Sequence, residues 1–110
     1  MVTSLGLPTG TSGKASVMML DRGNRHSCRL DLLEWTSPAT AGRPYPSLLN
    51  AGIARIALVT IGIQQEYERL SAHGVEFLSP PTALAWPRVI LACAKDPDGT
   101  ILELMEFVKD

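Results

Sequence analysis

Residues 96–107 constrain the fold more than any other stretch, because they read as a tight turn followed by a strand. Asp96-Pro97-Asp98-Gly99 has turn chemistry: Pro97 fixes its own φ, the aspartates bond the local backbone, and Gly99 tolerates a positive φ. Side chains of the strand then alternate between two faces, and one face holds Ile101, Glu103, Met105 and Phe107. A carboxylate among apolar groups is costly to bury unless it is paired, protonated or used as a ligand. Glu103 is therefore the first candidate site residue.

The same pattern occurs twice in the chain. Sliding the sequence along itself places residues 16–35 over residues 88–107 without a gap. In this alignment Leu30-Asp31-Leu32 lies over Leu102-Glu103-Leu104, and Val17 lies over Val89. The repeat predicts two related modules, with Asp31 and Glu103 at equivalent positions in two sheets.

Between the repeats, residues 52–60 read as a strand that carries Arg55 on one face and Ile56 and Leu58 on the other. A helix is predicted over Gln64–Ala72, because apolar residues recur at helical spacing and Gly74 is suited to end the helix. We expect Ile56 and Leu58 to pack beneath this helix. Arg55 would then face the opposite, cavity side of the sheet.

The remaining segments are assigned from turn residues and from alternation of apolar side chains. Prolines and a glycine predict a linker between the modules at 36–50, because proline at that density blocks helix and sheet. Strands are predicted at 5–11 (weak), 16–20, 28–35, 75–78 and 88–95, with a turn or irregular strand at 84–87.

Three stretches of the sequence, taken in order, resemble the vicinal oxygen chelate superfamily. They are Gly52-Ile53-Ala54-Arg55-Ile56-Ala57-Leu58, the helix ending in His73-Gly74-Val75, and Asp96-Pro97-Asp98-Gly99 with Leu102-Glu103-Leu104. That superfamily includes glyoxalase I, bleomycin-resistance proteins and extradiol dioxygenases. The resemblance implies an α+β fold of tandem βαβββ modules that form a curved mixed sheet around a cavity. Module 1 would span about residues 1–36 and be truncated, the linker about 36–51, and module 2 about 52–110.

A complete first module of this superfamily would begin with a strand and a helix for which the sequence has no room. Three explanations stay open: an assigned start downstream of the real one, a naturally shortened module, or a partner chain that fills the gap. If the first strand is absent, an edge of the first sheet is open, and open edges tend to pair with another chain. We therefore expect a homodimer.

Composition and net charge limit the classes of partner that the protein is expected to bind. The formal net charge is −1, which gives no electrostatic case for nucleic acid or a membrane surface, so a small-molecule ligand is the better expectation. The start of the chain lacks a basic region and a long apolar run, and we expect a cytoplasmic protein. Cys28 and Cys93 show no CxxC spacing and are interpreted as reduced thiols, with Cys93 in the core.

Three charged residues lie on apolar strand faces, namely Asp31, Arg55 and Glu103. The resemblance implies a histidine metal ligand where this chain has Arg55, and a guanidinium has no lone pair for a metal. Asp31 and Glu103 alone would make a weak transition-metal site. We therefore expect no cofactor, although a divalent metal is possible if a dimer partner or His26 contributes.

Several functions remain open. Arg55 could hold an anionic or carbonyl oxygen while Asp31 or Glu103 accepts a proton, which suits isomerase, epimerase or lyase chemistry. The chain could instead bind or sequester a small molecule without catalysis, act as a divalent-metal enzyme whose site is completed across a dimer, or use the charged residues only for structure. Candidate ligand-binding residues are Trp35, Tyr45, Trp86, Met105 and Phe107.

Overall fold

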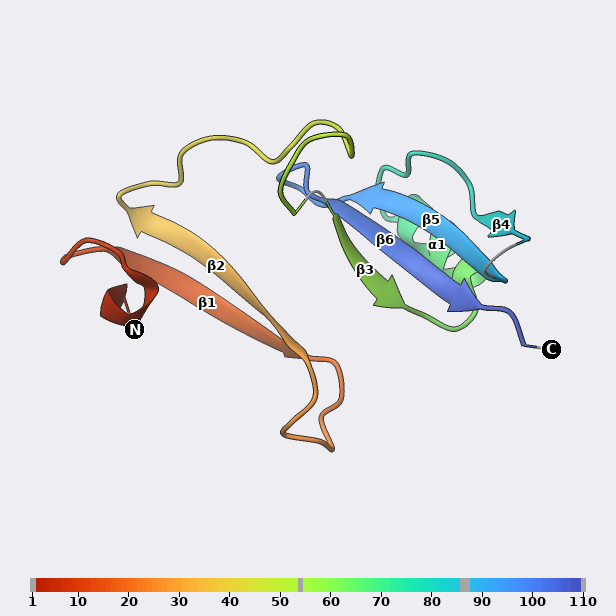
Figure 1. Cartoon of the computed structure of the whole chain (residues 1–110), viewed down its shortest axis with the longest axis horizontal. Helices are drawn as coiled ribbons and strands as arrows, with labels where there is room; N and C mark the ends of the chain where they lie inside the picture. Colours follow the sequence, from red (N-terminus) through yellow and green to blue (C-terminus); the bar gives the residue numbers. More distant parts are fainter. Residues whose placement is uncertain (1, 54, 86–87, 110) are drawn as a thin grey trace. The chain divides into compact units, whose positions relative to one another are not determined.

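The computed structural model describes residues 2–53, 55–85 and 88–109 and divides the chain into two compact units, Met1–Gly42 and Arg43–Asp110 (Figure 1). The first unit holds a short 3-10 helix η1 (Val2–Leu5) and strands β1 (Ser12–Met19) and β2 (Arg29–Ser37). The second holds β3 (Arg55–Val59), α1 (Ile63–Ala72), β4 (Thr82–Leu84), β5 (Val89–Lys95) and β6 (Ile101–Phe107). The fold is α+β, as predicted.

The second unit is a complete βαβββ module, which confirms the α+β fold and one of the two modules that the resemblance implied. Its four strands form one sheet in the order β3-β6-β5-β4. β3 runs parallel to β6, and the remaining pairs are antiparallel. A parallel pair needs a crossover, and α1 belongs to the segment that supplies it. The helix packs on β5 and β6 rather than chiefly beneath β3, where it was expected.

The helix ends as the sequence predicts. Gly74 has φ 86°, which favours glycine, and its N–H donates to the carbonyl of Ser71. The N–H of Val75 donates to the carbonyl of Leu70 at 3.0 Å. These two bonds make a Schellman motif, which satisfies carbonyls that the helix leaves free.

The first unit is an antiparallel hairpin of β1 and β2. The weak strand predicted at 5–11 is wrong: the N–H of Thr11 donates to the carbonyl of Pro8 at 3.2 Å, which closes a turn, and β1 begins only at Ser12. Gly6 and Gly10 both have positive φ, so the chain changes direction here instead of extending.

The register of the paired strands shows that the gapless alignment of the two repeats is wrong for β1 and β5. Cys93 lies opposite Glu103 in the second unit, whereas Val17 lies opposite Asp31 in the first. If β2 and β6 are equivalent, Val17 therefore corresponds to Cys93 and not to Val89. The gapless alignment missed this shift because the loop that joins β1 to β2 is longer than the turn that joins β5 to β6.

Two further segments differ from prediction. Instead of a strand at 75–78, a single bridge joins Phe77 to Ala94, flanked by a hydrogen bond from Leu78 N–H to the carbonyl of Cys93. β4 (Thr82–Leu84) begins two residues before the segment predicted at 84–87 and ends at its first residue, and residue 85 lies in a turn. Trp86 lies outside the described residues.

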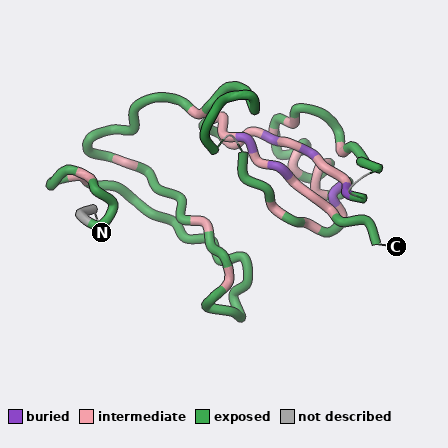
Figure 2. Tube along the Cα trace, viewed as in Figure 1, coloured by how far each residue is buried: buried purple, intermediate pink, exposed green. Residues whose placement is uncertain are grey.

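The core of the described chain lies in the second unit, where Figure 2 shows the buried positions. Its buried apolar residues are Ile63, Val89, Ala92, Ala94 and Ile101. The first unit has no buried position among residues 4–42, because two strands alone cannot cover both of their faces. Within the described ranges, no helix has the length and apolarity needed to cross a membrane.

Candidate functional site

Glu103 lies on an inner strand of the four-stranded sheet. Among the charged residues that the structure describes, it alone is buried. It lies on β6, opposite Ala57 of β3 on one side and Cys93 of β5 on the other. Only 5% of its surface is exposed. A carboxylate at this depth needs a partner, as its place among apolar residues predicts.

Arg55 provides that partner. Its Nε lies 3.0 Å from Oε2 of Glu103. Arg55 and Ala57 are two residues apart on β3, so Arg55 shares the face on which Glu103 lies. The two side chains differ in solvent access, with 49% of Arg55 and 6% of Glu103 exposed. Arg55 thus compensates a buried charge while half of its own side chain stays in water.

The guanidinium of Arg55 has unused hydrogen-bonding capacity. Nε is the nitrogen that pairs with Glu103, and the Nη groups of Arg55 donate no hydrogen bond to residues 2–53, 55–85 and 88–109. An arginine carries five N–H donors in a planar fork that matches oxygen pairs. This side chain can therefore donate to a ligand without giving up its contact with Glu103.

The two oxygens of Glu103 differ. Oε2 faces Arg55 and accepts a hydrogen bond from Sγ of Cys93 at 4.0 Å. Oε1 accepts no hydrogen bond from the described part of the chain. Because no buried polar side-chain atom there lacks a partner, Oε1 keeps contact with solvent. One oxygen of the carboxylate is thus held by the protein, and the other is not completely enclosed.

Cys93 is the residue that sequence reasoning interpreted as plain core. Burial raises the pKa of its thiol, the negative charge of Glu103 raises it further, and the positive charge of Arg55 opposes both effects. The turn at residues 96–99 could have given the register that puts this thiol opposite Glu103. Side-chain alternation alone places Cys93 on a face with Val89 and Leu91 and does not show which residue of the next strand lies opposite it.

Asp31 and Trp35 belong to the first unit. Asp31 is exposed on β2, opposite Val17. Trp35 is half-buried and lies over Gly13, where a Cβ would come within 2.9 Å of the indole ring. Their roles at a site stay predictions.

The other predicted ligand-binding residues belong to the second unit. Tyr45 is 46% exposed, and its ring and hydroxyl pack against Gly52, which ties the linker to the segment before β3. Met105 is half-buried on the face of Glu103, and Phe107 is exposed at the end of β6. Trp86 was also predicted and lies outside the described residues.

The donor set does not fit a divalent metal. Within the described residues, no three histidine, cysteine, aspartate or glutamate side chains converge. Arg55 puts a positive charge directly beside Glu103, where it repels a cation. His26 lies in the turn between β1 and β2, and its N–H donates to Oδ1 of Asn24.

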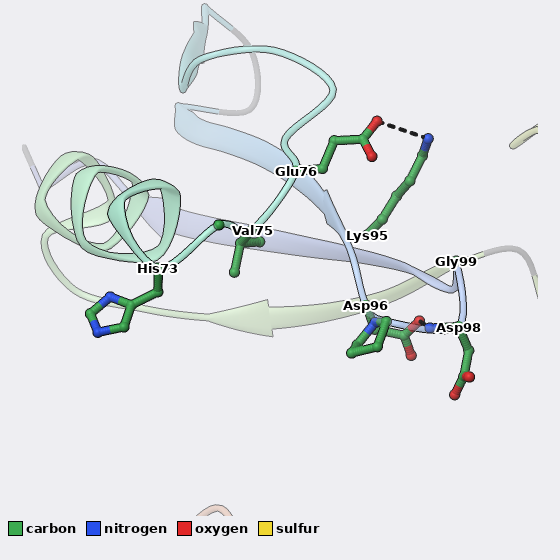
Figure 3. A pocket seen from close by; sticks show the side chains of 9 residues that line it. His73, Val75, Glu76, Lys95, Asp96, Asp98 and Gly99 are labelled. Atoms are coloured by element: carbon green, nitrogen blue, oxygen red, sulfur yellow. Dashed lines mark hydrogen bonds and ion pairs between the residues drawn. The ribbon is translucent and has the colours of Figure 1, made fainter.

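A surface pocket of about 590 Å³ lies between the end of α1 and the turn before β6 (Figure 3). Lys95 pairs with Glu76 across it at 3.1 Å. Oδ1 of Asp96 accepts hydrogen bonds from the N–H groups of Asp98 and Thr100, which confirms the predicted turn. Two of the polar groups that line this pocket thus bind each other, and a third group, the Asp96 carboxylate, holds the turn.

A second pocket of about 590 Å³ lies where β3 and β6 end. Its walls are mostly apolar and include Val59, Ile61, Phe107 and Glu106. Glu106 is a structural residue that the sequence did not reveal, because its carboxylate binds the start of α1.

Comparison with known proteins gives a family match and similar structures. The profile of the Glyoxalase/Bleomycin resistance protein/Dioxygenase superfamily matches residues 9–104. A glyoxalase/bleomycin resistance protein/dioxygenase structure from Nocardioides is 28% identical, with a TM-score of 0.50, over 66% of this chain and 46% of that one. TioX from Micromonospora sp. ML1 is 13% identical, with a TM-score of 0.48, over 86% of this chain and 79% of that one. No curated protein matches. The chain thus covers less than half of the Nocardioides protein.

Proposed function

Because the chain belongs to the Glyoxalase/Bleomycin resistance protein/Dioxygenase superfamily, we propose that it binds a small carbonyl compound, and that Arg55 donates hydrogen bonds to the carbonyl oxygen. One observation carries this proposal. The Arg55 side chain is half-exposed and held beside Glu103 through Nε, and its Nη groups donate no hydrogen bond to the described residues.

The charge of the pair favours a carbonyl over a free anion. Arg55 and Glu103 together carry no net charge, so an uncharged carbonyl oxygen meets the guanidinium donors without net repulsion. An anion would gain a charge-assisted hydrogen bond from Arg55. It would also be repelled by the carboxylate of Glu103, whose Oε2 lies 3.0 Å from Nε of Arg55. A neutral carbonyl compound is therefore the first ligand to test.

The same geometry supports proton transfer as a second candidate function. Oε1 of Glu103 has no protein donor and keeps contact with solvent, so it can accept a proton. As the proton leaves the carbon next to the carbonyl, the C–H bond pair would form a C=C bond and the C=O π pair would move to the carbonyl oxygen held by Arg55. Isomerases, epimerases and lyases of carbonyl compounds use this step.

Isothermal titration calorimetry tests binding. The probes are pyruvamide, a neutral carbonyl compound; pyruvate, which adds a carboxylate; and acetate, which lacks the ketone. We expect pyruvamide to bind the natural chain and Arg55→Gln to weaken that binding about tenfold or more, because charged donors make the stronger hydrogen bonds. Arg43→Gln, at an exposed linker arginine, is the matched control and should bind as the natural chain does. Equal binding by Arg55→Gln would contradict the proposal, as would tighter binding of acetate than of pyruvamide.

Hydrogen exchange separates the two candidate functions. In D₂O, the methyl protons of bound pyruvamide should exchange for deuterium if Oε1 accepts a proton, and proton NMR follows their loss. Glu103→Gln should abolish the exchange while the calorimetric binding persists. If the natural chain binds the probe and catalyses no exchange, the chain is a binding protein for this ligand.

A further inference from the structure

Oε2 of Glu103 has two partners, and they approach from neighbouring strands. Nε of Arg55 on β3 lies 3.0 Å away, and Sγ of Cys93 on β5 donates at 4.0 Å. Both partners use the same oxygen. Oε1 accepts no hydrogen bond from residues 2–53, 55–85 and 88–109.

The backbone holds Cys93 firmly in place. The residue pairs with Glu103 in the register of β5 and β6, and its carbonyl accepts a hydrogen bond from the N–H of Leu78 at 2.9 Å. Its chain neighbours Ala92 and Ala94 are buried on the opposite face of the sheet. A cysteine has one side-chain torsion before its sulfur, so a fixed backbone leaves Sγ few positions.

We propose that Cys93 is a positioning residue of the Arg55 site: its thiol and the guanidinium hold Oε2 of Glu103 together, so that Oε1 is the oxygen that meets the ligand. This inference rests on the proposed function. A carboxylate held through one partner can rotate and present either oxygen, because the terminal torsion of glutamate is broad. Two partners on the same oxygen select one orientation.

The expected effect is modest, because a thiol is a weak donor. Cys93→Ala removes the donor and should weaken pyruvamide binding about threefold, at the lower end of the range for one hydrogen bond. Cys93→Ser keeps a donor at the same position and should restore binding. A cysteine with only a packing role would not give this pattern, because alanine and serine leave a similar space.

Alkylation of the thiol tests the contact without any ligand. The exposed Cys28 is first replaced by serine, so that iodoacetamide reports on Cys93 alone at a fixed pH near neutral. Glu103→Gln removes a charge that raises the pKa of Cys93, so the thiolate fraction and the alkylation rate should rise several-fold. Arg55→Gln removes a charge that lowers this pKa, so the rate should fall.

The outcomes separate this inference from the proposed function. Unchanged alkylation in both variants would overturn the contact, and with it the positioning role. If pyruvamide binds and Cys93→Ala binds it equally well, the positioning role alone fails. If none of the probes binds the natural chain, the proposed function fails, and the role of Cys93 in binding fails with it, whatever the alkylation rates show.

Discussion

Oε2 of Glu106 accepts a hydrogen bond from the N–H of Ile63 at 2.8 Å, which joins the end of β6 to the first residue of α1. Oε1 of the same carboxylate accepts from the N–H of Gly62 at 3.1 Å. The N-cap residue of the helix is Gly62, which has no side chain to do this. A glutamate distant in sequence therefore satisfies two N–H groups that a helix start leaves free.

We expect Glu106→Gln to lower the urea midpoint of unfolding. A glutamine side chain offers one acceptor oxygen in place of two, and its neutral amide loses the attraction to the positive end of the helix dipole. Urea denaturation followed by circular dichroism measures the change. The control is Glu34→Gln, at an exposed position on β2. A midpoint equal to that of the control would mean that the cap does not stabilise the helix.

The pH dependence of stability should follow the same carboxylate. The hydrogen bonds from Ile63 and Gly62 hold the pKa of Glu106 below its ordinary value. A carboxyl group whose folded pKa is lowered stabilises the fold above its unfolded pKa, and this stabilisation is lost as the pH falls through the folded pKa. Denaturation midpoints measured between neutral and acid pH should fall less in Glu106→Gln than in the natural chain. An identical fall in both would exclude this role of Glu106.

Arg55 and Glu103 should respond unequally to substitution. Arg55→Gln leaves a nearly buried carboxylate without its charge partner, and we expect a loss of about 1–3 kcal/mol in the free energy of unfolding. Glu103→Gln leaves a guanidinium that is 49% exposed and still hydrated, so we expect a loss below about 1 kcal/mol. Chemical denaturation of both variants measures the difference. A larger loss in Glu103→Gln than in Arg55→Gln would indicate a structural network instead of a binding site.

The sequence predicted the parts of the fold that local chemistry decides. The Asp96-Pro97-Asp98-Gly99 turn and the end of α1 at Gly74 depend on residues close in sequence, and both were predicted correctly. The strand expected at 5–11 is wrong because Gly6, Pro8 and Gly10 turn the chain, with positive φ at both glycines. Local patterns thus located the elements better than their boundaries.

The site could not be predicted in full, because several of its contacts join residues that are distant in sequence. Alternation along β6 identified Glu103, and its apolar surroundings predicted that it needs a partner. Only the strand register shows that the thiol of Cys93 lies opposite Glu103, and the gapless repeat alignment did not give the correct register. Glu106 was missed altogether, because a cap supplied by a distant strand depends on how the helix packs. The predicted site role of Asp31 stays a prediction.

The most direct test of Arg55 as the ligand-binding group is the NMR signal of its side-chain Nε–H, assigned by its loss in Arg55→Lys. Pyruvamide should shift this signal in a saturable way, with the affinity that calorimetry gives, and should leave the Nε–H signal of Arg43 unmoved. Binding that leaves the Arg55 signal unchanged would place the ligand elsewhere and would exclude Arg55 as the ligand-binding group.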